Sequence, residues 1–449
     1  MVLKMTKASL QIATSSRFTV SLLIAVGLAA LIGCSSLQST SDTVTKPVVS
    51  PPASPPVTPP ATPLPPNPPV PTTWVFCANE YQGCSFMGLR DVRFVLDGKA
   101  TVQSFYGHLE SCKEYLFGLS VGGSGAARCE YSSVMKTATL TNPMPGMGGL
   151  GATVTVPLGQ PGFAEARVQA TTDRGNLGMD VGAFREPCDV SHFAFDDPIV
   201  SPGKPGASHL HMFFGNSNTD AYSTTDSINN LGSSSCAGGI LNRSAYWVPA
   251  LIDGIGNVVL PSSAIFYYKS GYGGVKPADI NAMPDGLRMI SGDKNLSSAQ
   301  GQGAWGCEEI YIGHLDSIKA VFDDGRCTAG NHLQLSFEFP QCWDGKYLDS
   351  SNHKSHMAFP TGSGCPVTHP KAIPVITFNV RFPIPAVAAT NWHLSSDMYD
   401  YASKGGGFSA HGDWWNGWDV NTKNTWIKNC LNPSTDCHAY LLGDGRTLF

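Results

Sequence analysis

The chain has 449 residues, 14% of them charged, with 48 glycines, 33 prolines and a formal net charge of -5. Helical bundles need charged outer faces, so this composition argues against them and favours a turn-rich β protein. No run of lysine and arginine occurs, which argues against nucleic acid as a partner. The length suggests two or three domains.

The first 33 residues have the pattern of a bacterial lipoprotein signal peptide. A basic start containing Lys4, Lys7 and Arg17 precedes an apolar run, residues 18–32, that is short for a membrane span. A small residue directly before Cys34 is what a lipoprotein signal peptidase reads. We therefore predict an exported lipoprotein of the cell envelope, at the outer membrane or cell surface, held by lipid on Cys34 alone. The alternative is an ordinary cysteine after a cleaved secretory signal.

Residues 34–73, from the lipidated cysteine onward, are rich in serine, threonine and proline with repeated Pro-Pro steps. Such a segment stays extended as polyproline II and builds no core. We predict a stalk that holds the rest of the chain away from the membrane.

Twelve of the 13 cysteines remain once Cys34 is set aside. An even number in an exported protein implies disulfides, although spacing does not decide their connectivity. Nearest neighbours give the simplest pairing, which joins Cys342 to Cys365, Cys307 to Cys327 and Cys430 to Cys437. Because no CxxC pair occurs, a cysteine-ligated zinc site is not expected.

Residues 74–133 are predicted to form a small β module stapled by two disulfides. Its Cys-Ala-Asn-Glu sequence from Cys77 and Cys-Ser-Phe from Cys84 resemble small modules found beside catalytic domains in secreted bacterial carbohydrate-active proteins. That resemblance implies glycan binding. Residues 134–182 have strand-like stretches between turns, and we interpret them as a connecting β segment.

Residues 183–449 are predicted to form one large, mainly β domain. Aromatic and β-branched runs recur there between turn residues, and amphipathic helical periodicity is weak. A β-sandwich of the jelly-roll kind, with irregular loops and few helices, accommodates such strands. The best candidate for a helix is residues 305–322.

Three clusters of ionisable residues stand out in this charge-poor domain. One lies in residues 343–360 between two cysteines, one around residues 196–211, and one around residues 411–419. We predict that they converge on a single site, with these candidate catalytic residues: Asp197, His209, His211, Asp349, His353, His356, His411 and Asp413.

The histidines of these clusters have metal-ligand spacing. If residues 207–214 form a strand, His209 and His211 project from the same face, as two metal ligands or as a base with its partner. A divalent metal could be held there; no other cofactor is indicated. His353 and His356 would share a face on a helical turn. The competing interpretations are a polar surface pair and a solvated loop.

Aromatic side chains near the clusters favour a sugar ligand. Pyranose faces carry apolar C–H patches that stack on such rings. The candidate substrate-binding residues are Tyr246, Trp247, Lys269, Trp414, Trp415 and Trp418. Tryptophans of a strand-rich protein are otherwise core residues, and we expect at least one of the last three to be so.

Several motifs in order carry a family resemblance. They are Asp197-Pro-Ile-Val-Ser-Pro-Gly with Ser208-His-Leu-His, Ser244-Ala-Tyr-Trp-Val-Pro-Ala-Leu, Trp343-Asp-Gly and His411-Gly-Asp. Together, over about residues 184–440, they resemble the domain-of-unknown-function family numbered nineteen ninety-six, found in secreted fungal and bacterial proteins. The resemblance implies an extracellular, polysaccharide-associated setting and no particular reaction. Residues 204–207 lengthen the turn before the histidine pair relative to the family's pattern.

Motifs of other enzyme classes are absent from the sequence. There is no Gly-x-Ser-x-Gly elbow, His-Glu-x-x-His, P-loop or dinucleotide fingerprint, which disfavours serine hydrolases, zincins, kinases and Rossmann enzymes. We expect a surface-anchored lipoprotein that cleaves extracellular or cell-wall polysaccharide with its His/Asp cluster, as a hydrolase or a lyase. The alternatives are a non-catalytic glycan-binding or adhesion lipoprotein, and a structural envelope protein whose motifs are buried hydrogen-bond networks.

Overall fold

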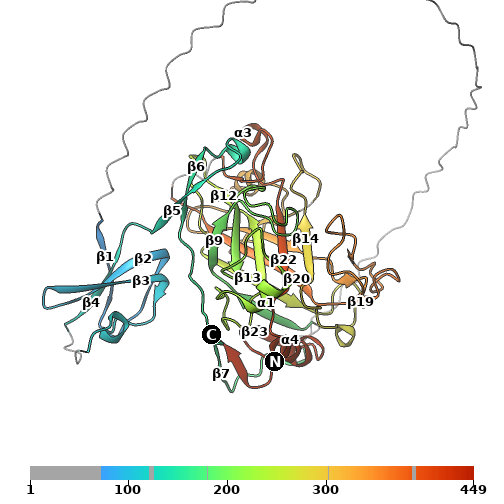
Figure 1. The fold of residues 1–449 in the computed structure, drawn as a ribbon, viewed down its shortest axis with the longest axis horizontal. Coiled ribbons are helices and arrows are strands. Elements are labelled where there is room, and N and C mark those ends of the chain that lie inside the picture. The colour runs from blue at the N-terminus through green and yellow to red at the C-terminus, as the bar shows by residue number, and fades with distance from the viewer. Residues whose placement is uncertain (1–71, 121–125, 179–180, 302, 387–390) are drawn as a thin grey trace, which may run out of the picture. The chain divides into compact units, whose positions relative to one another are not determined.

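The computed structural model describes residues 72–120, 126–178, 181–301, 303–386 and 391–449 (Figure 1). The predicted signal peptide, Cys34 and all but the last two residues of the predicted stalk lie outside these residues. In the described part of the chain, no helix combines the length and hydropathy needed to cross a membrane.

The first described segment folds as a four-stranded antiparallel sheet with the order β1-β4-β2-β3. A tight turn joins β2 to β3 through Asp97 and Gly98, both with positive φ, as hairpin turns of two residues require. The sheet has its own apolar core and two disulfides, Cys77–Cys84 and Cys112–Cys129. Its elements are β1 (Trp74–Asn79), β2 (Cys84–Leu96), β3 (Lys99–Leu109), η1 (Glu114–Phe117) and β4 (Arg128–Ser132).

The next segment contributes short paired strands. β5 and β6 form a hairpin, and β7 pairs with β24 at the end of the chain. The elements are β5 (Thr137–Thr141), η2 (Met147–Gly149), β6 (Thr153–Pro157), β7 (Val168–Ala170) and β24 (Arg446–Leu448).

Two sheets facing one another make the large domain. The five-stranded sheet has the order β14-β22-β11-β10-β9, and the six-stranded sheet has the order β15-β16-β20-β13-β8-β23. The first consists of β9 (Val190–Ala194), β10 (His211–Gly215), β11 (Ala245–Pro249), β14 (Arg288–Gly292) and β22 (His411–Trp415). The second consists of β8 (Ala183–Pro187), β13 (Ser263–Lys269), β15 (Trp305–Cys307), β16 (His332–Glu338), β20 (Val375–Pro383) and β23 (Asp436–Ala439).

Aromatic side chains fill the space between the sheets. Tyr246 of β11 stacks on Phe266 of β13 with ring centroids 3.9 Å apart, and Phe266 meets Phe378 of β20 edge-on at 4.6 Å. Six disulfides staple the described chain, and they include the three nearest-neighbour pairs predicted from the sequence. Of the other three, two lie in the small sheet described above and one joins Cys188 to Cys236. The predicted mainly β architecture is confirmed.

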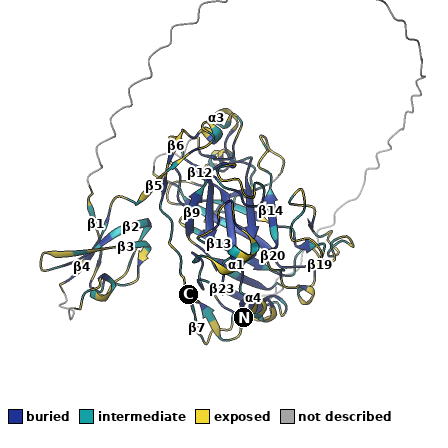
Figure 2. Cartoon of the chain, viewed as in Figure 1, coloured by how far each residue is buried: buried dark blue, intermediate teal, exposed yellow. Residues whose placement is uncertain are grey.

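The two sheets differ in how their outer faces are covered. Strand β13 alternates buried and partly exposed residues, the mark of a sheet with one face open. Strands β10, β11 and β22 are buried at every position (Figure 2). A separate apolar cluster explains this, because Ile199 from the loop before β10 and Ile228 of α1 (Thr225–Asn230) pack with Trp247 and Trp415 on the outer face.

The prediction of a helix at residues 305–322 is wrong for most of the segment. The segment begins as strand β15, and only α2 (Ile318–Asp323) is helical. Gly306 and Gly313 interrupt the segment, and Ser317 caps the helix by accepting a hydrogen bond from the Ala320 amide.

Short elements complete the domain. The strands are β12 (Leu251–Ile252), β17 (Cys342–Trp343), β18 (Met357–Ala358), β19 (Lys371–Ala372) and β21 (His393–Leu394). The helical elements are α1 (Thr225–Asn230), η3 (Pro277–Asp279), α3 (Tyr401–Lys404), α4 (Val420–Trp426) and the π-helical turn η4 (Ile427–Leu431) that continues α4.

Candidate metal centre

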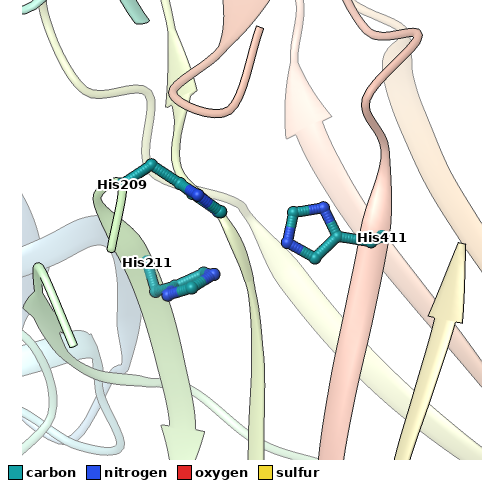
Figure 3. A group of neighbouring side chains, drawn as sticks. All are labelled: His209, His211 and His411. Atoms are coloured by element: carbon teal, nitrogen blue, oxygen red, sulfur yellow. The ribbon is translucent and has the colours of Figure 1, made fainter. Parts of the chain in front are cut away.

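Three histidines converge on the outer face of the five-stranded sheet. His211 and His411 are the first residues of β10 and β22, the strands on either side of β11, and His209 lies two residues before β10. Figure 3 shows their rings turned toward a common point. Ring centroids are 4.1 Å apart for His209 and His211, 5.0 Å for His209 and His411, and 5.8 Å for His211 and His411. One nitrogen from each ring lies within 4.8 Å of the other two.

Backbone carbonyls fix the orientation of two of these rings. Nδ1 of His211 lies 2.8 Å from the carbonyl oxygen of Asp196, and Nδ1 of His411 lies 2.8 Å from that of Ser409. A carbonyl oxygen only accepts, so each Nδ1 carries the proton and each Nε2 presents a lone pair. Nε2 of His209 and of His211 is buried and has no hydrogen-bond partner among the described residues. Metal-binding histidines are oriented in the same way, with the other ring nitrogen donating to a carbonyl or carboxylate oxygen.

Burial keeps the three imidazoles neutral. It lowers the pKa of His209 well below the ordinary value, that of His211 to about 4, and that of His411 to about 3. The charges of neighbouring histidines lower the pKa of His209 and His411 further. Neutral imidazole is the form that binds a metal, so the centre is in its ligating state at neutral pH.

Two aspartates lie beside the histidines. Asp413 is two residues beyond His411 in β22 and therefore on the same face. Burial and the charge of Asp197 raise its pKa well above the ordinary value, and its Oδ2 has no partner among the described residues. Asp197 instead uses Oδ1 to accept hydrogen bonds from the amides of Ile199 and Val200, at 3.1 and 2.9 Å. Asp413 thus offers a free oxygen, and Asp197 holds the covering loop.

The ligand set indicates the class of metal. Imidazole nitrogens suit zinc, copper, iron and nickel, whereas magnesium and calcium take oxygen ligands. Three histidines with a further position left for water are typical of catalytic zinc sites. The residues present therefore fit a transition metal.

The third predicted cluster forms a separate network. Asp349 pairs with Arg288 at 3.4 Å and with Nδ1 of His353 at 3.0 Å. His356 uses both ring nitrogens, one 3.0 Å from Oγ of Ser350 and the other 2.7 Å from the carbonyl oxygen of Arg288. These contacts tie residues 343–360 to β14, so Asp349, His353 and His356 hold a loop and are not brought to the three histidines.

The predicted sugar-binding aromatics are packed inside the domain. None of them has a ring face open to a sugar. The exposed fraction is at most 2% for each of Tyr246, Trp247, Trp414, Trp415 and Trp418. Trp418 donates from Nε1 to the Tyr268 hydroxyl at 3.0 Å, and Trp415 lies beneath the Arg288 guanidinium at 3.9 Å. All three tryptophans near the C-terminus are core residues. Lys269 alone of the six lines an open cleft.

That cleft and one lysine were not singled out from the sequence. The cleft has a volume of about 1080 Å³ and is lined by the outer face of the six-stranded sheet, by β14 and by residues 353–359. Lys294 follows β14, and its charge lowers the pKa of all three histidines and of Asp413. The alternation of the two strand faces along β13 is the signal that could have placed Tyr267 and Lys269 together on the open face of the sheet.

Comparison with known proteins yields one family. No curated protein and no solved structure matches the chain. Residues 197–418 match the family described as a domain of unknown function (DUF1996), and they include all three histidines of the centre. Residues 197–418 are therefore a domain of the DUF1996 family.

Proposed function

We propose that this protein is an envelope lipoprotein that binds a transition metal at His209, His211 and His411 and uses it to cleave extracellular polysaccharide. The observation that carries the proposal is the convergence of three buried imidazoles, each with a ring nitrogen within 4.8 Å of the other two. The envelope location rests on the sequence around Cys34, and the polysaccharide on the open polar cleft and the setting implied by the family.

The chemistry follows from the ligand set. A metal held by His209, His211 and His411 would lower the pKa of a bound water to near neutrality and would so supply hydroxide. Hydrolysis adds water across a glycosidic bond: the hydroxyl goes to the anomeric carbon, the bond from that carbon to the bridging oxygen breaks, and the proton goes to the departing oxygen. Asp413 has a free carboxylate oxygen on the face that carries His411, and it is our candidate for proton exchange.

Burial favours a second function, non-catalytic glycan binding. The exposed fractions of His209, His211 and His411 are 6%, 0% and 3%, so little of these rings is open to a polymeric substrate. A metal there would join the loop before β10 to β22 and would stabilise the fold. The cleft would then bind glycan without turnover.

Product formation separates the two functions. The full-length protein in mild detergent is incubated with acidic and neutral polysaccharides, and new chain ends are measured by reducing-end assay and mass spectrometry. We expect shortened products from the wild type and at least about a hundredfold less from His411→Ala, since a metal ligand is lost. His332→Ala, which changes a partly exposed histidine paired with Glu309, is the matched control and keeps full turnover.

Binding without product would support the second function. Equal turnover by wild type and His411→Ala would refute the metal-dependent reaction.

A further inference from the structure

The open face of the six-stranded sheet forms the floor of the cleft. Outward-facing side chains of β13, β16 and β20 line it, among them Tyr267, Lys269, Ser336 and Asn379. Most of them are polar or aromatic, whereas the inward-facing residues of the same strands are apolar. A polar floor on a sheet face that nothing in the described chain covers is a binding surface for a hydrophilic ligand.

Contacts among the floor residues hold them in place before any ligand arrives. Oγ of Ser336 donates to Oδ1 of Asn379 at 2.8 Å. The Arg185 guanidinium binds both carboxylate oxygens of Asp436, at 2.5 and 3.2 Å. Such prearranged amides and hydroxyls suit the hydroxyl groups of a sugar, because little side-chain entropy is lost on binding.

Aromatic rings are available in this cleft, unlike those at the centre. Tyr267 lies beneath Arg185 at 5.3 Å, and the Lys269 ammonium lies 4.8 Å from the ring centroid of Tyr272. Phe359 is 54% exposed at the rim. These rings offer apolar faces for the C–H patches of a pyranose.

Positive charge is in excess along the walls. Asp436 neutralises Arg185, but neither Lys269 nor Lys354 has an ion pair with a carboxylate in the described chain. Lys354 donates to the carbonyl oxygen of Gly292 at 2.7 Å, and Glu338 is the remaining acidic side chain of the lining. Two ammonium groups against one exposed carboxylate favour an anionic ligand.

One wall of the cleft is β14, the strand that pairs with β22. Gly292, part of its lining, lies directly opposite His411 in the pairing of β14 with β22. The charge of Lys354 also acts on Asp413. A chain bound along the sheet would therefore reach the strand that borders the three histidines.

We propose that this cleft binds an extracellular glycan whose sugars carry carboxylates, with Tyr267 and Tyr272 stacking on the rings and Lys269 and Lys354 pairing with the acid groups. The proposal names the substrate class and rests on the proposed function for its link to the metal centre. The cleft itself is independent of the metal.

Affinity electrophoresis and titration calorimetry of the full-length protein test the proposal. The probes are polygalacturonate, which carries a carboxylate on each sugar, and pullulan, which is uncharged. We expect binding of polygalacturonate, weakened about tenfold by Lys269→Gln through loss of one charge-assisted contact. Lys269→Arg keeps the charge and most of the binding, and Lys428→Gln, exposed and outside the cleft, is the matched control with unchanged binding.

Equal retention on the two polymers, no retention on either, or the same affinity for Lys269→Gln and Lys428→Gln would overturn the proposal. Repeating the titration with His411→Ala separates it from the proposed function. Retained polygalacturonate binding by this variant would show that the cleft binds glycan without the metal centre. Turnover by the variant equal to that of the wild type would remove the metal-dependent reaction and leave the cleft assignment standing.

Discussion

The difference between a ligand histidine and a structural one lies in what its second ring nitrogen meets. In His211 and His411 a backbone carbonyl oxygen accepts a hydrogen bond from Nδ1–H, and Nε2 is left facing the other imidazoles. In His356 both nitrogens already have partners. The same residue type in similar sequence surroundings therefore has two different roles.

His356→Ala should destabilise the fold by about 1–3 kcal/mol, since the Arg288 carbonyl and Ser350 would lose their partner in a buried site. Unfolding by urea at pH 7 measures this. His353→Asn is the control, with an expected loss of about 1 kcal/mol or less because its ion pair is partly exposed. A smaller loss for His356→Ala than for His353→Asn would contradict the structural role of His356.

The sequence identifies the histidines as candidates but cannot sort them. The His-x-His motif and His411 are visible in it. The partners that decide their roles come from distant segments, as the Arg288 carbonyl does for His356. No local pattern reports such a contact.

Among the elements, strand β8 carries an acid into the space between the sheets. Glu186 is fully buried, and neither carboxylate oxygen has a hydrogen-bond partner among the described residues. Burial raises its pKa well above the ordinary value of 4.5, so it is protonated in the folded protein at mildly acidic pH. A carboxylate oxygen of Glu186 lies within 4.8 Å of the sulfurs of Cys188 and Cys236. These sulfurs are joined in a disulfide and therefore cannot bind a metal.

Glu186→Gln should flatten the pH dependence of stability. A raised folded-state pKa gives stability that is complete below the unfolded pKa and is lost as pH rises toward the folded value. In that window each pH unit costs the wild type about 1.4 kcal/mol, and the neutral amide avoids this cost. Melting temperatures from pH 5 to pH 8 measure the slopes, with exposed Glu165→Gln as control. Parallel curves for wild type and Glu186→Gln would contradict the buried acid.

Strands can be predicted where buried and exposed residues alternate clearly. Prediction fails where both faces of a strand are covered, because that alternation is then lost. The alternation of β13 follows from one open face. Strands β10, β11 and β22 are short and buried on both faces, so their sequences do not show which side carries a site. The apolar spacing of residues 305–322 resembled a helix although two glycines divide it.

At the scale of the whole molecule, sheet order brings the site together. β10 and β22 are far apart in the sequence but flank β11, which places His211 beside His411. β14 then separates this centre from the cleft. Neighbouring cysteine pairs and the mainly β class could be predicted from the sequence, because they depend on local spacing and composition. Strand order depends on contacts between distant segments. The sequence therefore could not predict that two of the three clusters converge and that the third does not.

Elemental metal analysis of the full-length protein, purified in detergent without chelator or affinity metal, tests the central claim most directly. We predict one transition-metal ion per chain in the wild type and its loss in His211→Ala and His411→Ala. The variants His332→Ala, at a partly exposed histidine, and His356→Ala, at a buried one, should keep the metal. A wild-type protein that holds no metal after zinc, copper, iron or nickel is supplied, or equal metal content in all four variants, would contradict the three-histidine centre.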